Sequence, residues 1–292
     1  MLMRPTFLDW LFLLCLIFLW GTSFMVTAIA VESVSPLGVV ALRVLLGALV
    51  LFPVVVLRGL KFPRNAGAWG GFFLMAVVGN LAPFYLIAWG QQEIDSGIAG
   101  VLMAVMPLVT MVLAHFFVPG ERLNLFKLSG FVLGITGVIL LLGPTMESGG
   151  GEVLRGLAIL GAAVCYAVNT ILARRLPHFN PLIVGTGVLV AASLIVVPVW
   201  ATQELAGQGA SFSRESMLAL VWLGVAPTGL ATIVYFAVIG RAGPSFLSNI
   251  NYLIPVVAFF TGVWILSEPV TGTSLFSLAI ILTGIALTRY RA

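Results

Sequence analysis

Ten long apolar segments, separated by short polar or Pro- and Gly-rich breaks, decide what this chain can fold into. Each is close to the roughly 20 residues that an α-helix needs to cross the hydrocarbon core of a bilayer. The segments span residues 9–31, 36–58, 66–91, 96–118, 124–143, 153–173, 181–201, 216–239, 244–266 and 271–289. We therefore predict an all-α integral membrane protein with ten transmembrane helices.

Composition agrees with this interpretation and narrows the class of protein. Hydrophobic residues make up 61% of the chain and charged residues only 8%, whereas about 25% of the residues of a soluble domain are charged. No loop is long enough to form a domain of its own. The net charge of +4 is therefore no sign of a nucleic-acid partner, and we expect the partners to be the lipid bilayer and a small-molecule substrate.

The loop charges orient the helices in the membrane. If the N-terminus is cytoplasmic and ten helices alternate, two basic residues lie outside, Arg155 and Arg214. The cytoplasmic side then holds eleven: Arg4, Arg58, Lys61, Arg64, Arg122, Lys127, Arg174, Arg175, Arg241, Arg289 and Arg291. Because lysine and arginine concentrate in cytoplasmic loops, we expect both termini in the cytoplasm.

The two halves of the chain repeat one another. Pro107 and Pro255 lie 148 positions apart and Glu121 and Glu268 lie 147 apart, about half of the 292 residues. Each half holds five segments, an odd number, so the second copy enters the membrane from the opposite side. We predict two inverted five-helix repeats, at residues 1–146 and 147–292, which together form one membrane domain.

Inverted repeats of this kind are common in secondary transporters, which bind substrate near the midplane between the repeats. Proline interrupts the third and fourth apolar segments of each half, where it removes a backbone donor and kinks a helix. We expect hinges at these four positions: Pro83, Pro107, Pro227 and Pro255.

The segment Leu19-Trp-Gly-Thr-Ser-Phe24 resembles the signature of the drug/metabolite transporter superfamily, EamA type. The same resemblance is carried by Ala41-Leu-Arg43, by Pro107 and by Gly120-Glu121. It implies ten helices in two inverted repeats and export of small metabolites across the bacterial inner membrane. Within the family the chain is most similar to exporters of aromatic and other hydrophobic amino acids. The second half departs from the pattern, because Tyr166-Ala-Val-Asn169 replaces the Trp-Gly-x-Ser-Phe element.

Arg43 is the one basic residue well inside a segment. A charge in hydrocarbon is expensive unless it is paired. Two interpretations fit: Arg43 binds a substrate carboxylate, or it pairs with backbone carbonyls or another helix and holds the fold together.

Polar and aromatic residues near the middle of the other segments are the remaining candidates for a substrate site. Asn80 and Tyr85 flank Pro83, but on a helical period they lie about 140° apart and cannot line one narrow cavity wall. A hydrogen bond between helices therefore explains Asn80 about as well as substrate binding does. Near-midplane residues from both halves complete the set of expected contacts: Trp20, Asn80, Tyr85, Met103, Tyr166, Asn169, Asn249 and Asn251. Core packing is an equally good explanation for Met103.

These residues predict an aromatic, amide-rich and nearly uncharged cavity. Such a cavity suits neutral or zwitterionic solutes, amino acids with apolar or aromatic side chains first and other metabolites or amphipathic drugs second. We expect export by alternating access, with uniport and proton antiport both open. The sequence predicts no catalytic residue, metal site or cofactor, which disfavours a membrane enzyme, and the short loops disfavour a receptor or scaffold. A monomer is compatible with the sequence, which does not fix the oligomeric state.

Overall fold

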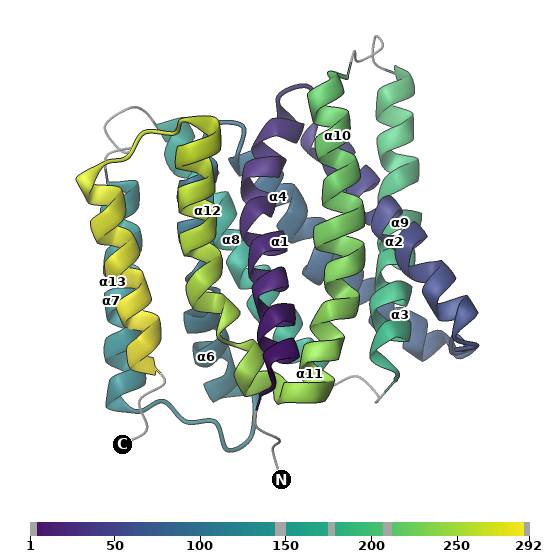
Figure 1. Cartoon of the computed structure of the whole chain (residues 1–292), viewed down its shortest axis with the longest axis horizontal. Coiled ribbons are helices and arrows are strands. Elements are labelled where there is room, and N and C mark those ends of the chain that lie inside the picture. Colours follow the sequence, from purple (N-terminus) through teal and green to yellow (C-terminus); the bar gives the residue numbers. More distant parts are fainter. Residues whose placement is uncertain (1–4, 144–149, 175–178, 207–211, 289–292) are drawn as a thin grey trace.

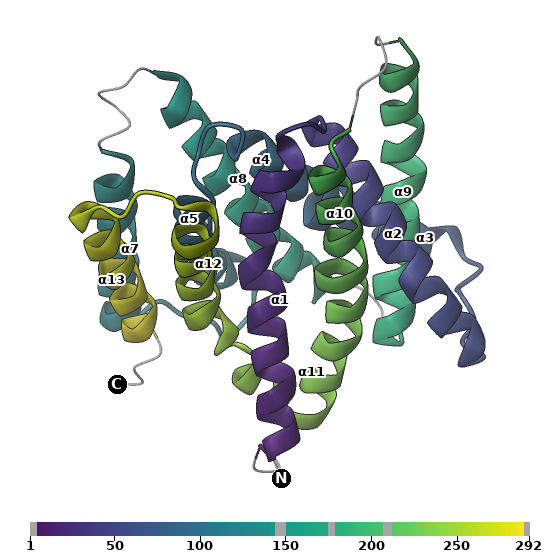
Figure 2. The ribbon, with the colours of Figure 1, turned by 45° about the horizontal axis from the view of Figure 1, so that its top comes forward.

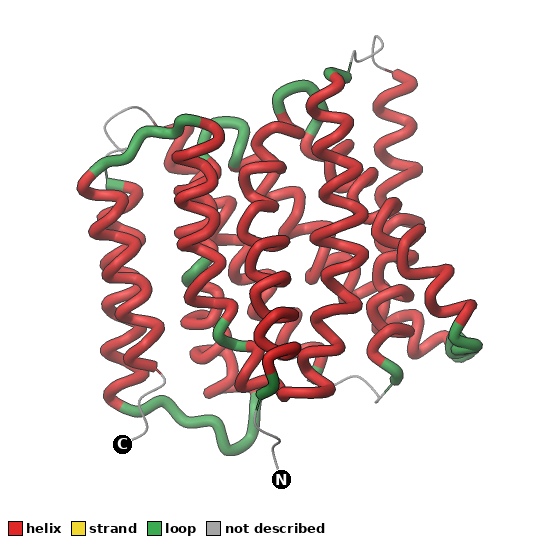
Figure 3. The backbone as a smooth tube through the Cα atoms, viewed as in Figure 1, coloured by secondary structure: helices red, strands yellow, loops and turns green. Residues whose placement is uncertain are grey.

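The computed structural model describes residues 5–143, 150–174, 179–206 and 212–288. The described residues form helices joined by loops and contain no strand (Figure 3). In order the elements are α1 (Phe7–Val31), α2 (Pro36–Leu57), α3 (Ala66–Ala76), η1 (Val77–Leu81), α4 (Ala82–Gly90), α5 (Ser96–Met103), α6 (Met106–Phe117), α7 (Leu125–Leu142), α8 (Gly150–Ala173), α9 (Pro181–Ala206), α10 (Arg214–Leu223), η3 (Gly224–Leu230), α11 (Ala231–Leu247), α12 (Ile250–Leu266) and α13 (Gly272–Thr288). The segments η1 and η3 are π-helical.

These elements form the ten predicted apolar helices, some of them in two or three parts. Among the described residues, eight helical stretches are long and apolar enough to cross a membrane, and α12 and α13 are shorter apolar helices. The described ends of the chain, near Phe7 and Thr288, lie on the same side of the molecule (Figure 1). We call this the N-terminal side and the opposite one the far side. The predicted boundary between residues 146 and 147 lies outside the described residues.

Local sequence sets the helix ends. The side chains of Ser35, Asn65, Asn124 and Ser213 each accept a hydrogen bond from the first turn of the helix that follows, which satisfies backbone donors that lack an intrahelical partner. Between the eighth and ninth membrane segments the chain turns at Gly243, whose φ of 83° is a conformation that glycine adopts without strain. Pro244 follows at the start of the next helix.

The packing follows the inverted repeat. Three pairs of corresponding helices lie against each other, α2 with α9, α5 with α12, and α7 with α13. Helix α1 packs on α10, α11 and α12 of the second repeat, and its counterpart α8 packs on α4, α5 and α6 of the first. The two halves therefore interlock, and α7 and α13 form one edge of the molecule in both views (Figures 1 and 2).

Glycine lets the α7–α13 pair approach closely. A Cβ atom on Gly130 would collide with the carbonyl oxygen of Gly284, and one on Gly284 would lie 2.6 Å from the Gly130 oxygen. Small residues permit such contacts between membrane helices. The pair is therefore held by backbone-to-backbone packing.

The mid-helix prolines act differently in the two repeats. The fourth membrane segment is interrupted at Ala104 and Val105, directly before Pro107. The ninth is interrupted at Ser248 and Asn249, whereas Pro255 lies within the continuous α12. In the fourth segment the break follows Met103, whose carbonyl Pro107 cannot bond because proline has no N–H to donate. In the ninth segment the break lies six residues or more before Pro255, outside the turn that this proline affects.

Candidate substrate site

The third membrane helix of each repeat is distorted at the level of its proline. η1 precedes Pro83, and η3 contains Pro227. Pro227 cannot donate to the carbonyl of Leu223, and the hydroxyl of Thr228 donates to that oxygen instead, at 2.8 Å. π-Helical turns are rare and occur frequently at functional sites. The sequence predicted interruptions at these prolines but not their π-helical form.

Arg43 lies between η3 and the first turn of α4, the helix that follows η1. Its Nε–H donates to Thr228 Oγ1 at 2.9 Å, and its Cζ atom stands 3.9 Å from the centroid of the Phe84 ring. The residue is 7% exposed. Within the described chain no carboxylate lies within ion-pairing distance of it, and the recorded ion pairs involve Asp9, Glu93 and Glu121 instead. Arg43 is thus a buried cation held by contacts with uncharged residues of both repeats.

Aromatic side chains adjoin the same region. The indole N–H of Trp20 donates to the Pro227 carbonyl at 2.9 Å, and its ring lies 5.7 Å from that of Tyr235. Tyr166 on α8 is partly buried and packs against the apolar cluster that contains Phe24 and Ile87. The structure therefore brings Trp20 and Arg43 together at η3.

Asn169 lies on the same face of α8 as Tyr166. Its amide packs on Gly79 of η1, where a Cβ atom would meet the Asn169 side chain at 2.6 Å. Its Oδ1 atom is buried and has no hydrogen-bond partner in the described structure. A buried polar atom without a partner is uncommon and calls for an explanation, and a bound solute would supply one.

The other predicted contacts are more dispersed. Asn80 is half-buried within η1, Tyr85 is 40% exposed, and Met103 packs beside the same apolar cluster as Tyr166. Asn249 lies at the interruption that precedes α12 and Asn251 lies in the first turn of α12, so neither is at η1 or η3. These two asparagines remain predicted contacts, and the four prolines remain predicted hinges.

Sequence reasoning missed Thr228, Phe84 and Tyr235. Thr228 carried a local signal, because a hydroxyl next to a mid-helix proline can bond the carbonyl that the proline leaves free. Phe84 and Tyr235 carried none, since most aromatic residues of this chain pack against lipid or apolar side chains.

The far side is closed between α5 and α12 by a carboxylate. Glu268 Oε1 accepts hydrogen bonds from the backbone N–H and the hydroxyl of Ser96, at 2.7 and 2.6 Å, and Oε2 accepts from the N–H of Gly97 at 2.8 Å. Glu268 thus caps the N-terminus of α5, where the helix dipole favours negative charge. Its counterpart Glu121 lies on the N-terminal side, 3.7 Å from Lys127 Nζ, with 45% of its side chain exposed.

Asp95 precedes this cap in the loop on the far side. Partial burial, followed by the nearby carboxylates of Glu268 and Glu152, raises its pKa above 3.8. Its side chain forms no capping bond to α5.

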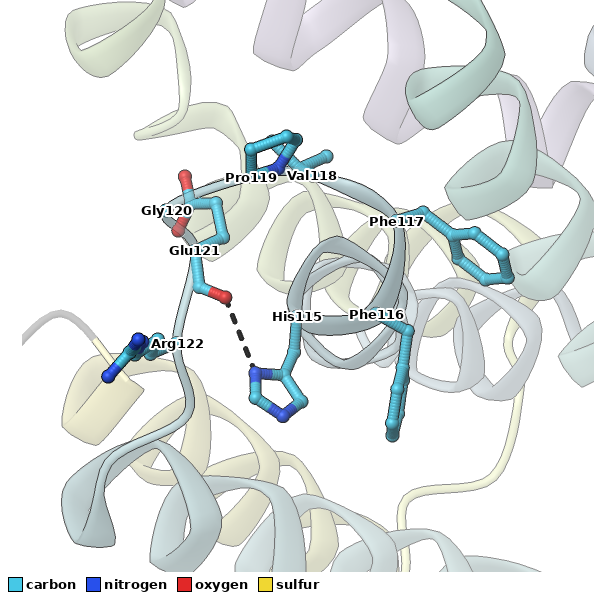
Figure 4. A pocket seen from close by; sticks show the side chains of 8 residues that line it. All are labelled: His115, Phe116, Phe117, Val118, Pro119, Gly120, Glu121 and Arg122. Atoms are coloured by element: carbon cyan, nitrogen blue, oxygen red, sulfur yellow. Dashed lines mark hydrogen bonds between the residues drawn. The ribbon is translucent and has the colours of Figure 1, made fainter.

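Two hollows lie apart from these residues. One, of about 310 Å³ on the N-terminal side, is lined by residues 115–122, and the His115 ring lies 3.3 Å from the Glu121 carbonyl (Figure 4). The other, of about 430 Å³, is an apolar groove between α2 and α9. Neither is lined by Trp20, Arg43 or Asn169.

Comparison with known proteins places the fold. A solved crystal structure superposes with a TM-score of 0.67, covers 96% of each chain and is 22% identical, which concerns the fold alone. The uncharacterized transporter YoaV of Bacillus subtilis is 25% identical over 93% of both chains. The uncharacterized inner membrane transporter YedA of Escherichia coli is 26% identical over 94% of this chain and 88% of its own. The chloroplastic WAT1-related protein At3g02690 of Arabidopsis thaliana is 27% identical over 98% of this chain and 70% of its own.

The comparison with family models also reproduces the internal duplication. The model of the EamA-like transporter family matches twice, at residues 9–143 and 155–290. These two matches cover most of the chain and coincide with the two interlocked sets of helices. The chain therefore belongs to the EamA-like transporter family and is a membrane transporter.

Proposed function

We propose that this transporter exports small neutral or zwitterionic metabolites, and first of all amino acids with apolar or aromatic side chains. The observation that carries the proposal is the buried guanidinium of Arg43, which contacts Phe84 of the first repeat and Thr228 of the second. A cation surrounded by aromatic groups suits a solute with one carboxylate and an apolar body.

The amide of Asn169 supports a zwitterion over a simple acid. Its unpaired oxygen is an acceptor of the kind that a substrate ammonium group needs. Trp20 and Tyr235 supply aromatic surface for the side chain of the substrate.

Alternating access is the mechanism that this architecture supports. The proposed substrate region lies between inverted repeats, and Glu268 joins the end of α12 to the start of α5 on the far side. We propose that the helices part on one side at a time, with the irregular turns before Pro107 and Pro255 as hinges. The bacterial inner membrane with both termini in the cytoplasm fits the loop charges and the description of YedA as an inner membrane transporter.

Counterflow in proteoliposomes tests the proposal. Vesicles containing the purified protein are preloaded with unlabelled phenylalanine, and uptake of labelled phenylalanine is followed with methionine, threonine, aspartate or lysine as competitors. Protein-free vesicles are the control. We expect phenylalanine and methionine to exchange and compete, and aspartate and lysine to compete weakly. Strong preference for aspartate, or no exchange of any amino acid, rejects the proposed substrate class.

A further inference from the structure

The hydrogen bonds around Arg43 fix which of its atoms are already engaged. The Thr228 hydroxyl donates its proton to Leu223 O at 2.8 Å, so its oxygen can accept from Arg43 Nε–H at 2.9 Å. Nε is the one Arg43 atom with a recorded hydrogen bond in the described structure. A guanidinium carries five N–H donors, so the four on Nη1 and Nη2 remain for another partner.

The ring of Phe84 covers one face of the guanidinium, with Cζ 3.9 Å from the ring centroid. Stacking of this kind holds the plane of the group while leaving its edges free. The Nη edge of a guanidinium matches the two oxygens of a carboxylate, with two parallel hydrogen bonds. Arg43 is therefore oriented by Thr228 and Phe84 with a carboxylate-binding edge unused.

We propose that Arg43 binds the carboxylate of the transported solute through Nη1 and Nη2, and that this carboxylate is obligatory for transport. The inference rests on the proposed function and specifies the chemical group that the site recognises. A buried cation without a counter-charge is destabilising. A solute carboxylate compensates the charge when it enters, whereas an amide, ester or amine of the same shape leaves it uncompensated.

The purely structural alternative makes a different prediction. If Arg43 only joined α2 to η3, its loss would lower the folded yield and would slow transport of all solutes equally. If Arg43 binds a carboxylate, the wild-type protein itself discriminates between phenylalanine and analogues that lack this group. Discrimination by the unmodified protein is therefore the first measurement, and it does not depend on whether a variant folds.

In the experiment, phenylalaninamide, phenylalanine methyl ester and phenethylamine compete for phenylalanine counterflow in proteoliposomes. Truncating one partner of a buried hydrogen-bonded charge pair lowers affinity by roughly 30-fold or more, and we expect a loss of at least this size for each analogue. Equal competition by phenylalaninamide overturns the Arg43 assignment and leaves amino-acid transport standing. Absence of phenylalanine exchange, by contrast, is a failure of the proposed function itself.

Two variants complete the test. Arg43→Gln should weaken phenylalanine exchange and reduce the discrimination against phenylalaninamide to a few fold. Arg155→Gln is the matched control, because the Arg155 Cζ atom also stands 3.9 Å from an aromatic centroid, that of Trp89, but its guanidinium is paired with Glu93 at 3.0 Å. Unchanged discrimination in folded Arg43→Gln protein refutes the proposal.

Discussion

Replacing Glu268 by glutamine should open the far side of the transporter. The carboxylate accepts three hydrogen bonds from Ser96 and Gly97 and thereby ties the end of α12 to the start of α5. Glutamine keeps one carbonyl oxygen but turns its NH₂ group toward one of the donors. It also removes the negative charge that the N-terminus of α5 stabilises.

The size of the effect follows from these losses. Hydrogen bonds to charged groups contribute about 1.5–3 kcal/mol and neutral ones about 0.5–1.5 kcal/mol, and a charge at a helix N-terminus contributes about 0.3–1 kcal/mol. The bonds are only partly buried, so solvent screening reduces the sum. We expect the closed far side to lose about 1–3 kcal/mol relative to the open one, roughly a 5- to 150-fold change in the equilibrium.

Cysteine accessibility measures this change. Val263 is partly buried on α12 beside the core cluster that includes Phe259, and Val263→Cys in a background without Cys15 and Cys165 provides one reactive thiol. Maleimide labelling of the detergent-solubilised protein should be faster when Glu268→Gln is added. Glu93→Gln is the control, since Glu93 is also a far-side carboxylate but pairs with Arg155. Equal labelling rates with and without Glu268→Gln, in folded protein, would refute the reasoning.

Three further predictions test other parts of the structure. Asp95→Asn should raise the melting temperature at pH 7, because the raised pKa of Asp95 means that its charged form is disfavoured in the folded state. The gain in melting temperature should shrink as the pH falls through that raised pKa and should vanish below about 3.8. A thermal-shift series against pH measures this dependence. Gly130→Val should destabilise the protein by about 1–3 kcal/mol, because the added side chain overpacks against Gly284. Thermal unfolding in detergent measures the loss, and Gly67→Val is the control because Gly67 is exposed. In intact cells an impermeant maleimide should label Val270→Cys and spare Lys61→Cys, and the opposite pattern would contradict the proposed orientation.

The helices could be predicted from the sequence because they depend on local physics. A run of about 20 apolar residues in a bilayer has few alternatives to a helix, and the offset between Pro107 and Pro255 exposed the duplication. The ends of the helices follow from capping residues such as Asn65 and Asn124, which also act locally.

The candidate site depended on contacts between repeats and was predicted only in part. Trp20, Arg43 and Tyr166 stood out as polar groups at mid-depth. Phe84 and Tyr235, in the third helices of the two repeats, carried no local signal. Thr228 carried one, its hydroxyl beside Pro227, but nothing local indicated its contact with Arg43. The position of the irregular turn before α12 was also hidden, because the turn lies at Ser248 and Asn249, whereas the sequence pattern pointed to Pro255. Sequence alone therefore identified several candidate groups but not the arrangement around them.

The place of Arg43 has a consequence for how a duplicated chain differs from a symmetric dimer. Phe84 and Thr228 follow Pro83 and Pro227 and so occupy corresponding positions in the two repeats, and Arg43 contacts both. Its own counterpart, counted from Pro36 and Pro181, is the buried Val188. In a dimer of identical five-helix chains every residue occurs twice, and two arginines at this point would repel each other across a shared axis. In one chain the two halves can differ at such positions, and here one half has an arginine where the other has a valine. A single buried positive charge therefore lies between the repeats.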